Sequence, residues 1–524
     1  MSYPSIFNDV LGPVMRGPSS SHCAASLRIG RLCRDLMDGQ ISKVLIEFDP
    51  EGSLATTHEA QGSDMGLFGG FLGWEAHDER LEHAIDDIAT AGIEIDIRLS
   101  ELEEKHPNTY KITLYNANAE KELIAISTGG GMIEVIGIDG AKVDMDGGYF
   151  ETFIYSRNPQ KVLNYIRQNI VCEDVEVHRG SNHSFVEIKS QSPIDELFLK
   201  EIELFDEVDS IKELRPVMPV LSKKQIEVPF ITCDEMLAYN EGKDLALWEL
   251  ALDYESKRGS ISPEEVLDKM SGIYQIMRTA INDGLQGTVY EDRILGSQSV
   301  KFKELMDNNK LIDGATTLNT IVMYVSAIME VKSSMGVIVA APTAGSCGAM
   351  PGAVIAVADS IHASEEETIK ALLASGLIGV FIAAHSTFAA EVGGCQAECG
   401  SGSTMAAAAI VELAGGNLAQ SICAASMALQ SALGMICDPI GNRVEAPCLN
   451  RNVMAASNAL SCANMALASY DHLIPLDQVI ETMYDVGKSI HNTLRCTNLG
   501  GLSITKAAKD IEAKLEKKYF YKNC

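Results

Sequence analysis

Basic residues are few in this sequence. The 42 lysines and arginines stand against 72 aspartates and glutamates, which gives a net charge of −30 and an isoelectric point near 4.7. Nucleic acids and anionic membranes bind surfaces on which lysine and arginine cluster. We therefore expect neither as a partner. An acidic surface favours solubility and repels anionic substrates at long range, so a site for one must attract it through short-range contacts.

Cysteine is scarce over most of the chain: four of the thirteen cysteines precede position 347, and nine lie from Cys347 onward. The sequence lacks the paired C-x2-C spacing of structural zinc sites. The count is odd, and no secretory leader follows Met1. We therefore expect a protein of the reducing cytoplasm rather than a secreted disulfide framework.

Long hydrophobic runs without polar interruption are also lacking. Residues 371–390 and 413–437 carry no charge, but His and Ser interrupt the first segment, and Asn, Gln and Ser interrupt the second. Small residues recur in both segments. These features favour buried helices of a tightly packed bundle over membrane-spanning helices.

The length of 524 residues exceeds that of one ordinary domain, so a multidomain protein is expected. Periodicity predicts a helix over 26–32 and, by period-two alternation, strands ending near the glycine triplet 129–131. No Lys-Ser/Thr pair follows the triplet, so we expect a turn there rather than a phosphate-binding loop. Residues 1–147 are thus predicted to form an N-terminal α+β domain, with strands at 44–48, 93–97, 110–114 and 123–126.

The rest of the chain divides into three further parts. Residues 148–215 read as strand, helix, two strands, helix, strand, which predicts a ferredoxin-like βαββαβ unit. Prolines interrupt regular structure after it, so 216–230 is predicted to be a linker. Helix signals and small residues then predict an all-α domain over 231–514, with a short tail at 515–524.

Three cysteines of the C-terminal half, Cys395, Cys437 and Cys448, lie beside Gly and Pro at spacings of 42 and 11 positions. Such neighbours let the backbone turn around a bulky group. Two interpretations stay open from these residues alone. The cysteines are buried, reduced core thiols, or they hold an iron–sulfur cluster whose iron without a protein thiolate can act as a Lewis acid.

Two hydroxyl-rich segments are candidate anion sites. Ser19, Ser20 and Ser21 precede a predicted helix, where backbone N–H groups and the helix dipole favour a carboxylate, although a plain N-cap cluster has the same appearance. Small residues around Thr343 and Ser346 allow the backbone to approach a ligand closely, or form a turn between helices.

Several segments together resemble a known family. They are RGPSSSH at 16–22, SMGVIVAAPTAGS at 334–346, EVGGCQ at 391–396, CDPIG through PC at 437–448, and LGGL at 499–502. In this order they resemble the iron–sulfur-dependent L-serine dehydratases, in a single-chain form with a fused smaller region. The resemblance implies a lyase that eliminates water from L-serine, giving pyruvate and ammonia in amino-acid degradation and gluconeogenesis. It also implies a [4Fe-4S] cluster held by Cys395, Cys437 and Cys448.

The same resemblance implies roles for the N-terminal motif. The serine carboxylate would bind in the pocket of Ser19, Ser20 and Ser21, with Thr343 and Ser346 close by, and its hydroxyl would bind the open iron. His22 is the candidate base that removes the α-proton.

One position departs from the family pattern. Gln61 stands where the family has the histidine of a Gly-His-Gly-Thr-Asp motif, and a glutamine cannot take up a proton near neutral pH. Three explanations stay open: His22 alone supplies the base, His58 substitutes for the missing histidine, or the reaction differs from that of the family. The alternatives are therefore another small amino acid, threonine or cysteine, as substrate, or a non-catalytic iron–sulfur sensor.

The βαββαβ unit resembles the ACT domains that members of this family carry. Its first strand is followed by residues 156–160, which lack the glycine usual in amino-acid-binding ACT domains, so a structural or dimerising role competes with amino-acid sensing. A homodimer is expected. At the other end of the chain, Cys524 carries a thiol and a carboxylate together. It would serve as a displaceable fourth ligand and self-inhibitor, or it belongs to a frayed tail.

Overall fold

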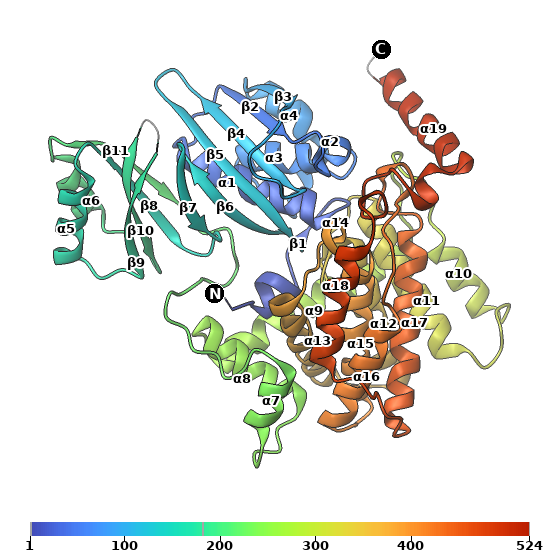
Figure 1. The fold of residues 1–524 in the computed structure, drawn as a ribbon. Coiled ribbons are helices and arrows are strands. Elements are labelled where there is room, and N and C mark those ends of the chain that lie inside the picture. The colour runs from blue at the N-terminus through green and yellow to red at the C-terminus, as the bar shows by residue number, and fades with distance from the viewer. Residues whose placement is uncertain (1–2, 181–182, 523–524) are drawn as a thin grey trace.

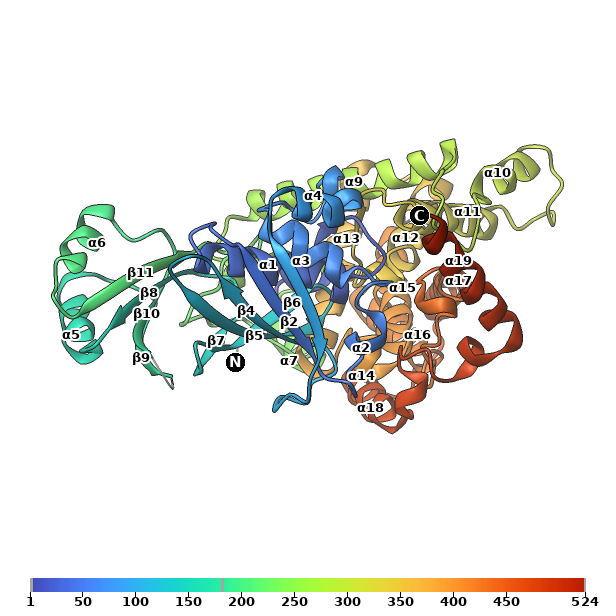
Figure 2. The same cartoon turned by 90° about the horizontal axis from the view of Figure 1, so that it is seen from above.

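The computed structural model describes residues 3–180 and 183–522. The chain forms an N-terminal α/β region with two sheets and a helix-rich C-terminal region (Figure 1). The two views agree that the four-stranded sheet lies at one end of the molecule, the helices at the other, and the six-stranded sheet between them (Figures 1 and 2).

The six-stranded sheet has the order β3-β2-β4-β5-β6-β7, and all neighbours are antiparallel except β2 and β3. The four strands expected from the sequence are present, and the helix expected over 26–32 is α1 (Ala25–Leu36). The strands are β2 (Lys43–Phe48), β3 (Glu94–Leu99), β4 (Thr109–Tyr115), β5 (Glu120–Gly129), β6 (Met132–Ile138) and β7 (Ala141–Met145).

The expectation that the strands end near 129–131 is wrong. The glycine triplet is a turn, as expected, but it joins β5 to β6, and two further strands extend the sheet. Gly129, Gly130 and Gly131 all have positive φ, between 63° and 107°. Only glycine adopts this conformation readily, so the triplet reverses the chain within a hairpin rather than ending the sheet.

Helices α1 and α3 (Ser63–Phe71) pack against each other through glycines. A Cβ atom added to Gly70 would lie 2.4 Å from the carbonyl oxygen of Leu27 and 2.7 Å from Cα of Gly30. The two backbones are therefore nearly in contact. This contact fixes α1, whose N-terminal end continues the π-helical turn η2 (Ser20–Ala24), which contains the last three residues of the PSSSH motif.

The four-stranded sheet has the order β11-β8-β10-β9 and is antiparallel throughout. Its core includes Ile154, Val162 and Ile202. The hydroxyl of Tyr155 donates to Asp139 Oδ2 at 2.7 Å, which joins this sheet to the six-stranded one. The elements are β8 (Phe150–Ser156), α5 (Pro159–Asn169), β9 (Asp174–Arg179), β10 (Ser184–Ser190), α6 (Glu196–Glu203) and β11 (Val208–Leu214).

The C-terminal region is helical with one small exception. Strand β12 (Ile338–Val339) pairs with β1 (Val14–Met15), so the N-terminal segment crosses into this region. The turn η1 (Ile6–Val10) packs on α13 (Glu365–His385), where an added Cβ at Gly379 would lie 2.1 Å from Cγ1 of Val10. The helices are α7 (Cys233–Asn240), α8 (Leu247–Gly259), α9 (Pro263–Gln286), α10 (Ser299–Asp307), α11 (Thr316–Ser333), α12 (Ala349–Ile361), α13 (Glu365–His385), α14 (Ala390–Gly393), α15 (Ser401–Leu413), α16 (Leu418–Gln430), α17 (Cys448–Leu467), α18 (Leu476–Ser489) and α19 (Lys506–Lys522).

Two helical segments, Ala344–Ile361 and Glu365–His385, are long and apolar enough to cross a membrane by length and composition. However, 83% and 72% of their windows are buried inside the protein, as in core helices. They pack against α15, and their apolar residues form part of the main core.

The close contact between α1 and α3 gives a first prediction. Replacement Gly70→Ala forces the two backbones apart and should lower the free energy of unfolding by about 1–3 kcal/mol. The measurement is urea unfolding followed by circular dichroism. Gly272→Ala in α9 is the matched control, because an added Cβ there meets no atom within 4 Å. It should be neutral or stabilising, by up to about 1 kcal/mol. Equal unfolding midpoints for both variants would contradict the prediction.

Candidate active site

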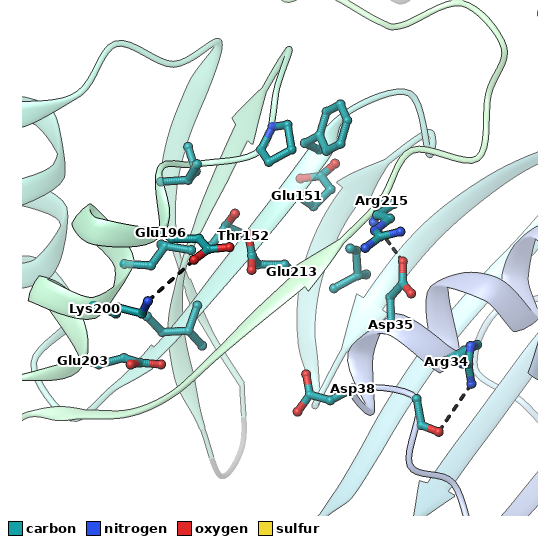
Figure 3. Close-up of a pocket in the computed structure, with 17 residues that line it drawn as sticks. Arg34, Asp35, Asp38, Glu151, Thr152, Glu196, Lys200, Glu203, Glu213 and Arg215 are labelled. Carbon is teal, nitrogen blue, oxygen red and sulfur yellow. Dashed lines mark hydrogen bonds and ion pairs between the residues drawn. The ribbon is translucent and has the colours of Figure 1, made fainter. Parts of the chain in front are cut away.

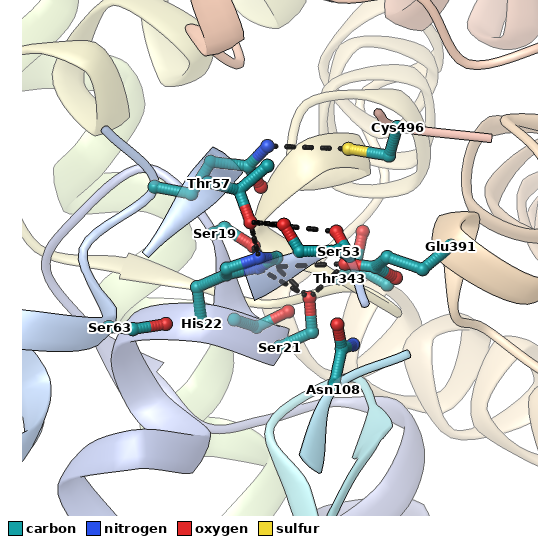
Figure 4. A network of polar contacts seen from close by, with 12 residues as sticks. Ser19, Ser21, His22, Ser53, Thr57, Ser63, Asn108, Thr343, Glu391 and Cys496 are labelled. Atoms are coloured by element: carbon teal, nitrogen blue, oxygen red, sulfur yellow. Dashed lines mark hydrogen bonds and ion pairs between the residues drawn. The ribbon is translucent and has the colours of Figure 1, made fainter. Parts of the chain in front are cut away.

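Three sequence motifs meet where the N-terminal region faces the helices. The hydroxyl oxygen of Ser20 accepts a hydrogen bond from the N–H of Ala344 at 3.1 Å. The hydroxyl of Ser21 donates to Glu391 Oε1 at 2.9 Å (Figure 4). The PSSSH, PTAGS and EVGGC segments are thus joined by hydrogen bonds between residues more than 300 positions apart.

His22 lies at the centre of this junction and is fully buried. Its Nε2 lies 2.8 Å from the hydroxyl oxygen of Thr57, and that hydroxyl donates its hydrogen to the carbonyl of Ser53 at 2.7 Å. Thr57 therefore accepts from Nε2–H, which places the lone pair of the neutral imidazole on Nδ1. Nδ1 faces the hydroxyls of Ser19 at 3.0 Å and Ser21 at 3.2 Å.

The surroundings of His22 favour a neutral base that can become a stabilised cation. Burial lowers the pKa of His22 below its usual 6.5, and the nearby carboxylate of Glu391 only partly opposes this. Glu391 Oε1 lies 3.5 Å from Nδ1. A proton taken up by Nδ1 would therefore meet a carboxylate charge at short range in a buried site.

His58, the possible substitute for the family's histidine, and Gln61, which stands at that position, lie in different surroundings. Nδ1 of His58 lies 2.8 Å from Asp64 Oδ2. Burial alone would lower the pKa of His58, but the hydrogen bond and charge of Asp64 outweigh it and raise the pKa. Gln61 is buried and donates from Nε2 to Cys496 Sγ at 3.3 Å. Gln61 thus contacts a thiol beside the cysteine cluster described below.

Asn108 is a candidate site residue that the sequence did not reveal. It lies immediately before β4, is fully buried, and is drawn with the polar network around His22 in Figure 4. Neither its amide oxygen nor its amide nitrogen has a hydrogen-bond partner in the described part of the chain, and the same holds for Glu391 Oε2. Buried polar atoms without partners are costly, so these groups are suited to a polar ligand. Nothing in the local sequence distinguishes Asn108 from an ordinary residue before a strand.

Thr343 and Ser346 lie together with a partly buried acid, Glu398. The hydroxyl of Thr343 donates to Glu398 Oε1 at 2.6 Å and lies 3.1 Å from the hydroxyl of Ser346. Burial, with a further contribution from the charge of Cys395, raises the pKa of Glu398 to about 8. Thr343 therefore holds Glu398 beside the cysteines.

Cys395 and Cys437 come together with Glu398. One ligand atom of each lies within 4.8 Å of the others, so these three could hold a metal ion. Cys395 immediately precedes the turn η5 (Gln396–Gly400), and Cys437 is held by its neighbour Cys496, whose N–H donates to the carbonyl of Cys437 at 2.9 Å. Hydrogen bonds from the thiols of Cys399 and Cys437 lower the pKa of Cys395 well below its usual value, and Arg451 adds to this effect.

The two remaining predicted ligands are Cys448, which the structure describes, and Cys524, which it does not. Cys448 begins α17 and is buried, and the charge of Cys395 is close enough to add to the effect of burial, which raises the pKa of Cys448. Cys399 and Cys496, which are not among the ligands that the family resemblance implies, belong to the same buried cluster as Cys395 and Cys437. Cys524 lies outside the described residues.

Comparison with known proteins identifies the family of the helical region. Residues 242–503 match the family described as serine dehydratase alpha chain, and the chain belongs to this family. It is 36% identical over 286 residues to the probable L-serine dehydratase alpha chain of Bacillus subtilis (strain 168), covering 55% of this chain and 95% of that protein.

Two further relatives extend the comparison. The L-serine dehydratase alpha chain of Peptoniphilus asaccharolyticus is 37% identical over 281 residues, which cover 53% of this chain and 96% of that protein. L-serine dehydratase 1 of Escherichia coli (strain K12) is 32% identical over 286 residues, which cover 53% of this chain and 62% of that protein.

The cysteine cluster gives a second prediction. Cys395→Ser and Cys437→Ser should lose most of the iron bound after anaerobic reconstitution with iron and sulfide, because each removes a thiolate from the group. The measurement is iron content with the visible absorption spectrum. Cys462→Ser in α17 is the matched control, since Cys462 is buried but lies outside the cluster. If Cys395→Ser and Cys437→Ser retained wild-type iron, these thiols would not be ligands.

Proposed function

We propose that this protein is an L-serine ammonia-lyase, which converts L-serine to pyruvate and ammonia. The observation that carries the proposal is the junction of His22 with Glu391, because it joins a buried base in the N-terminal region to the segment that bears Cys395. The family of residues 242–503 and the names of the relatives support the same reaction.

The cysteine group fits an iron–sulfur cofactor by its chemistry. The three thiols are buried, with exposed fractions of 1%, 3% and 4%, and one is poised as a thiolate, the form that binds iron. We propose that Cys395, Cys437 and Cys448 hold a [4Fe-4S] cluster. When bound, it would supply a Lewis acid that makes the substrate hydroxyl a better leaving group.

The chain's own groups would bind serine and move its α-proton. Nδ1 of His22 is the proposed acceptor of that proton, and Glu391 stabilises the imidazolium that forms. The unpartnered amide of Asn108 can donate to the substrate carboxylate, and the free oxygen of Glu391 can accept from its ammonium group. Burial excludes water from these contacts and strengthens them.

The first test is pyruvate formation from L-serine by protein reconstituted with iron and sulfide under anaerobic conditions. We expect turnover that is lost in air together with the cluster absorption. L-threonine and L-cysteine are assayed in parallel, because Gln61 replaces the family's histidine and a reshaped site could accept either. A stable cluster without turnover of any of the three would contradict the proposal and favour the sensor.

The second test separates the candidate bases. His22→Gln should lower kcat by about 10²–10⁴-fold, as expected for loss of a general base, whereas His58→Gln should cost less than about tenfold. The pH profile gives an independent readout. Because the pKa of His22 is lowered from 6.5, kcat/KM should fall only below pH 6.5. An acid limb above pH 6.5 would instead match His58, whose pKa is raised.

We propose further that residues 148–215 form an ACT-like unit and that the protein is a cytoplasmic homodimer. The βαββαβ order and the β11-β8-β10-β9 arrangement support the first point. In the loop after β8, the hydroxyl of Ser156 accepts from the N–H of Asn158, and Pro159 begins α5 directly. This tight connection favours a structural or dimerising role. The capping role of Cys524 also stays a prediction.

A further inference from the structure

A cavity of about 510 Å³ lies where the N-terminal segment, α1, the linker and α9 meet, away from the cysteine cluster. Its volume is within the range of about 300–1,000 Å³ usual for small-molecule sites. The walls are largely apolar and include Phe7, Leu11, Met218, Ile273 and Ile276. A ligand of this cavity would therefore have an aliphatic body.

The charge at this cavity is unusual for a protein of net charge −30. Arg28, Arg31, His77 and Lys269 line it, with Glu75 as the one acidic residue among the described lining residues. Arg31 is paired with Glu75 at 2.7 Å, and Lys269 with Glu265 at 3.6 Å. Of the arginines and lysines that line this cavity, Arg28 therefore has no ion pair among the described residues.

The cavity of Figure 3 has the opposite character. It measures about 680 Å³ and lies between the end of α1 and the four-stranded sheet. Three cations line it, against a larger set of carboxylates. The carboxylates are those of Asp35, Asp38, Glu151, Glu196, Glu203 and Glu213. A carboxylate ligand would be repelled there, so the sign of charge distinguishes the two cavities.

Arg28 is only 5% exposed, yet few of its donors are used. Nη1 donates to the carbonyl of Gly131 at 2.6 Å and lies 3.7 Å from Met132 Sδ, and its other N–H groups have no partner among the described residues. Asp9 is the acidic residue whose charge acts most strongly on Arg28, but no ion pair joins the two, and the Asp9 carboxylate accepts from the N–H of Ser5. A buried guanidinium with free donors is matched by a carboxylate, which it can bind through two hydrogen bonds.

We infer that this cavity binds an aliphatic monocarboxylate, with the carboxylate on Arg28 and the carbon chain against the apolar walls. The position of Arg28 links the cavity to the active site. Its partner Gly131 ends the glycine turn, and Gly129 of that turn packs on Ala389, two residues before Glu391. A ligand bound to Arg28 would thus lie beside the glycine turn, which contacts the segment that carries Glu391, the partner of His22.

The test is isothermal titration calorimetry of the reconstituted protein with sodium 4-methylpentanoate, and with the uncharged 4-methylpentanamide as the matched ligand. We expect the carboxylate to bind and the amide to bind more weakly by about tenfold or more, because the charge-assisted hydrogen bonds are lost. L-Leucine and 4-methyl-2-oxopentanoate, titrated in parallel, distinguish an amino acid from an oxo acid as the source of the carboxylate.

Two variants and a control test the placement. Arg28→Met should weaken binding by about tenfold or more. Gly272→Phe should abolish binding, because Gly272 lines the cavity and a side chain there has open space to fill. Gly272→Ala, which adds one methyl group to the same helix position, should leave binding intact. Gly272→Phe retains Arg28, so it tests the site even if Arg28→Met fails to fold.

The inference fails if the wild-type protein shows no binding of 4-methylpentanoate up to about 10 mM. It also fails if the amide binds as tightly as the carboxylate, or if folded Arg28→Met or Gly272→Phe binds like the wild type. Binding is measured without turnover, so the result does not depend on whether L-serine is the substrate.

Discussion

The candidate site depends on two hydrogen bonds between the N-terminal and helical regions. They join Ser20 to Ala344 and Ser21 to Glu391. His22 belongs to the N-terminal region, whereas Glu391 and Cys395 belong to the helical region. Neither region alone contains a buried base beside a cysteine cluster. The contact is supported on both sides: glycines hold α1 against α3, and β1 pairs with β12. Residues 6–15, which contact α13 through η1 and β12 through β1, therefore connect the two regions.

Burial sets the chemical state of the groups at this contact. His22 is kept neutral because the interior disfavours its cation, and Glu398 holds its proton to higher pH for the corresponding reason. Cys395 is the exception, because neighbouring thiols donate to it and Arg451 offsets its charge. The environment thus lowers the pKa of both His22 and Cys395, which favours a neutral imidazole and a thiolate, although the protein as a whole is strongly acidic.

Much of the secondary structure could be predicted because its signals are local. Alternation over 44–48 or 110–114 marks strands with one buried face, and Ser262 followed by Pro263 marks the start of α9. The hairpin beyond the glycine triplet was missed because a triplet of glycines serves equally as a loop or as a turn inside a sheet. Strand β12 was missed because two residues give no periodicity, and its pairing partner lies more than 300 positions away.

The sequence by itself determined which residues carry chemistry, since cysteine, histidine and serine have reactive groups wherever they lie, and their motifs match one family. The tertiary structure decided which of them meet. Asn108 became a candidate site residue, and Gln61 the partner of Cys496, only through the packing of distant segments. The same contacts leave Nδ1 of His22 as the candidate basic atom, because Nε2 is hydrogen-bonded to Thr57. Proximity, burial and hydrogen-bond direction are properties of the packed chain, and no local pattern encodes them.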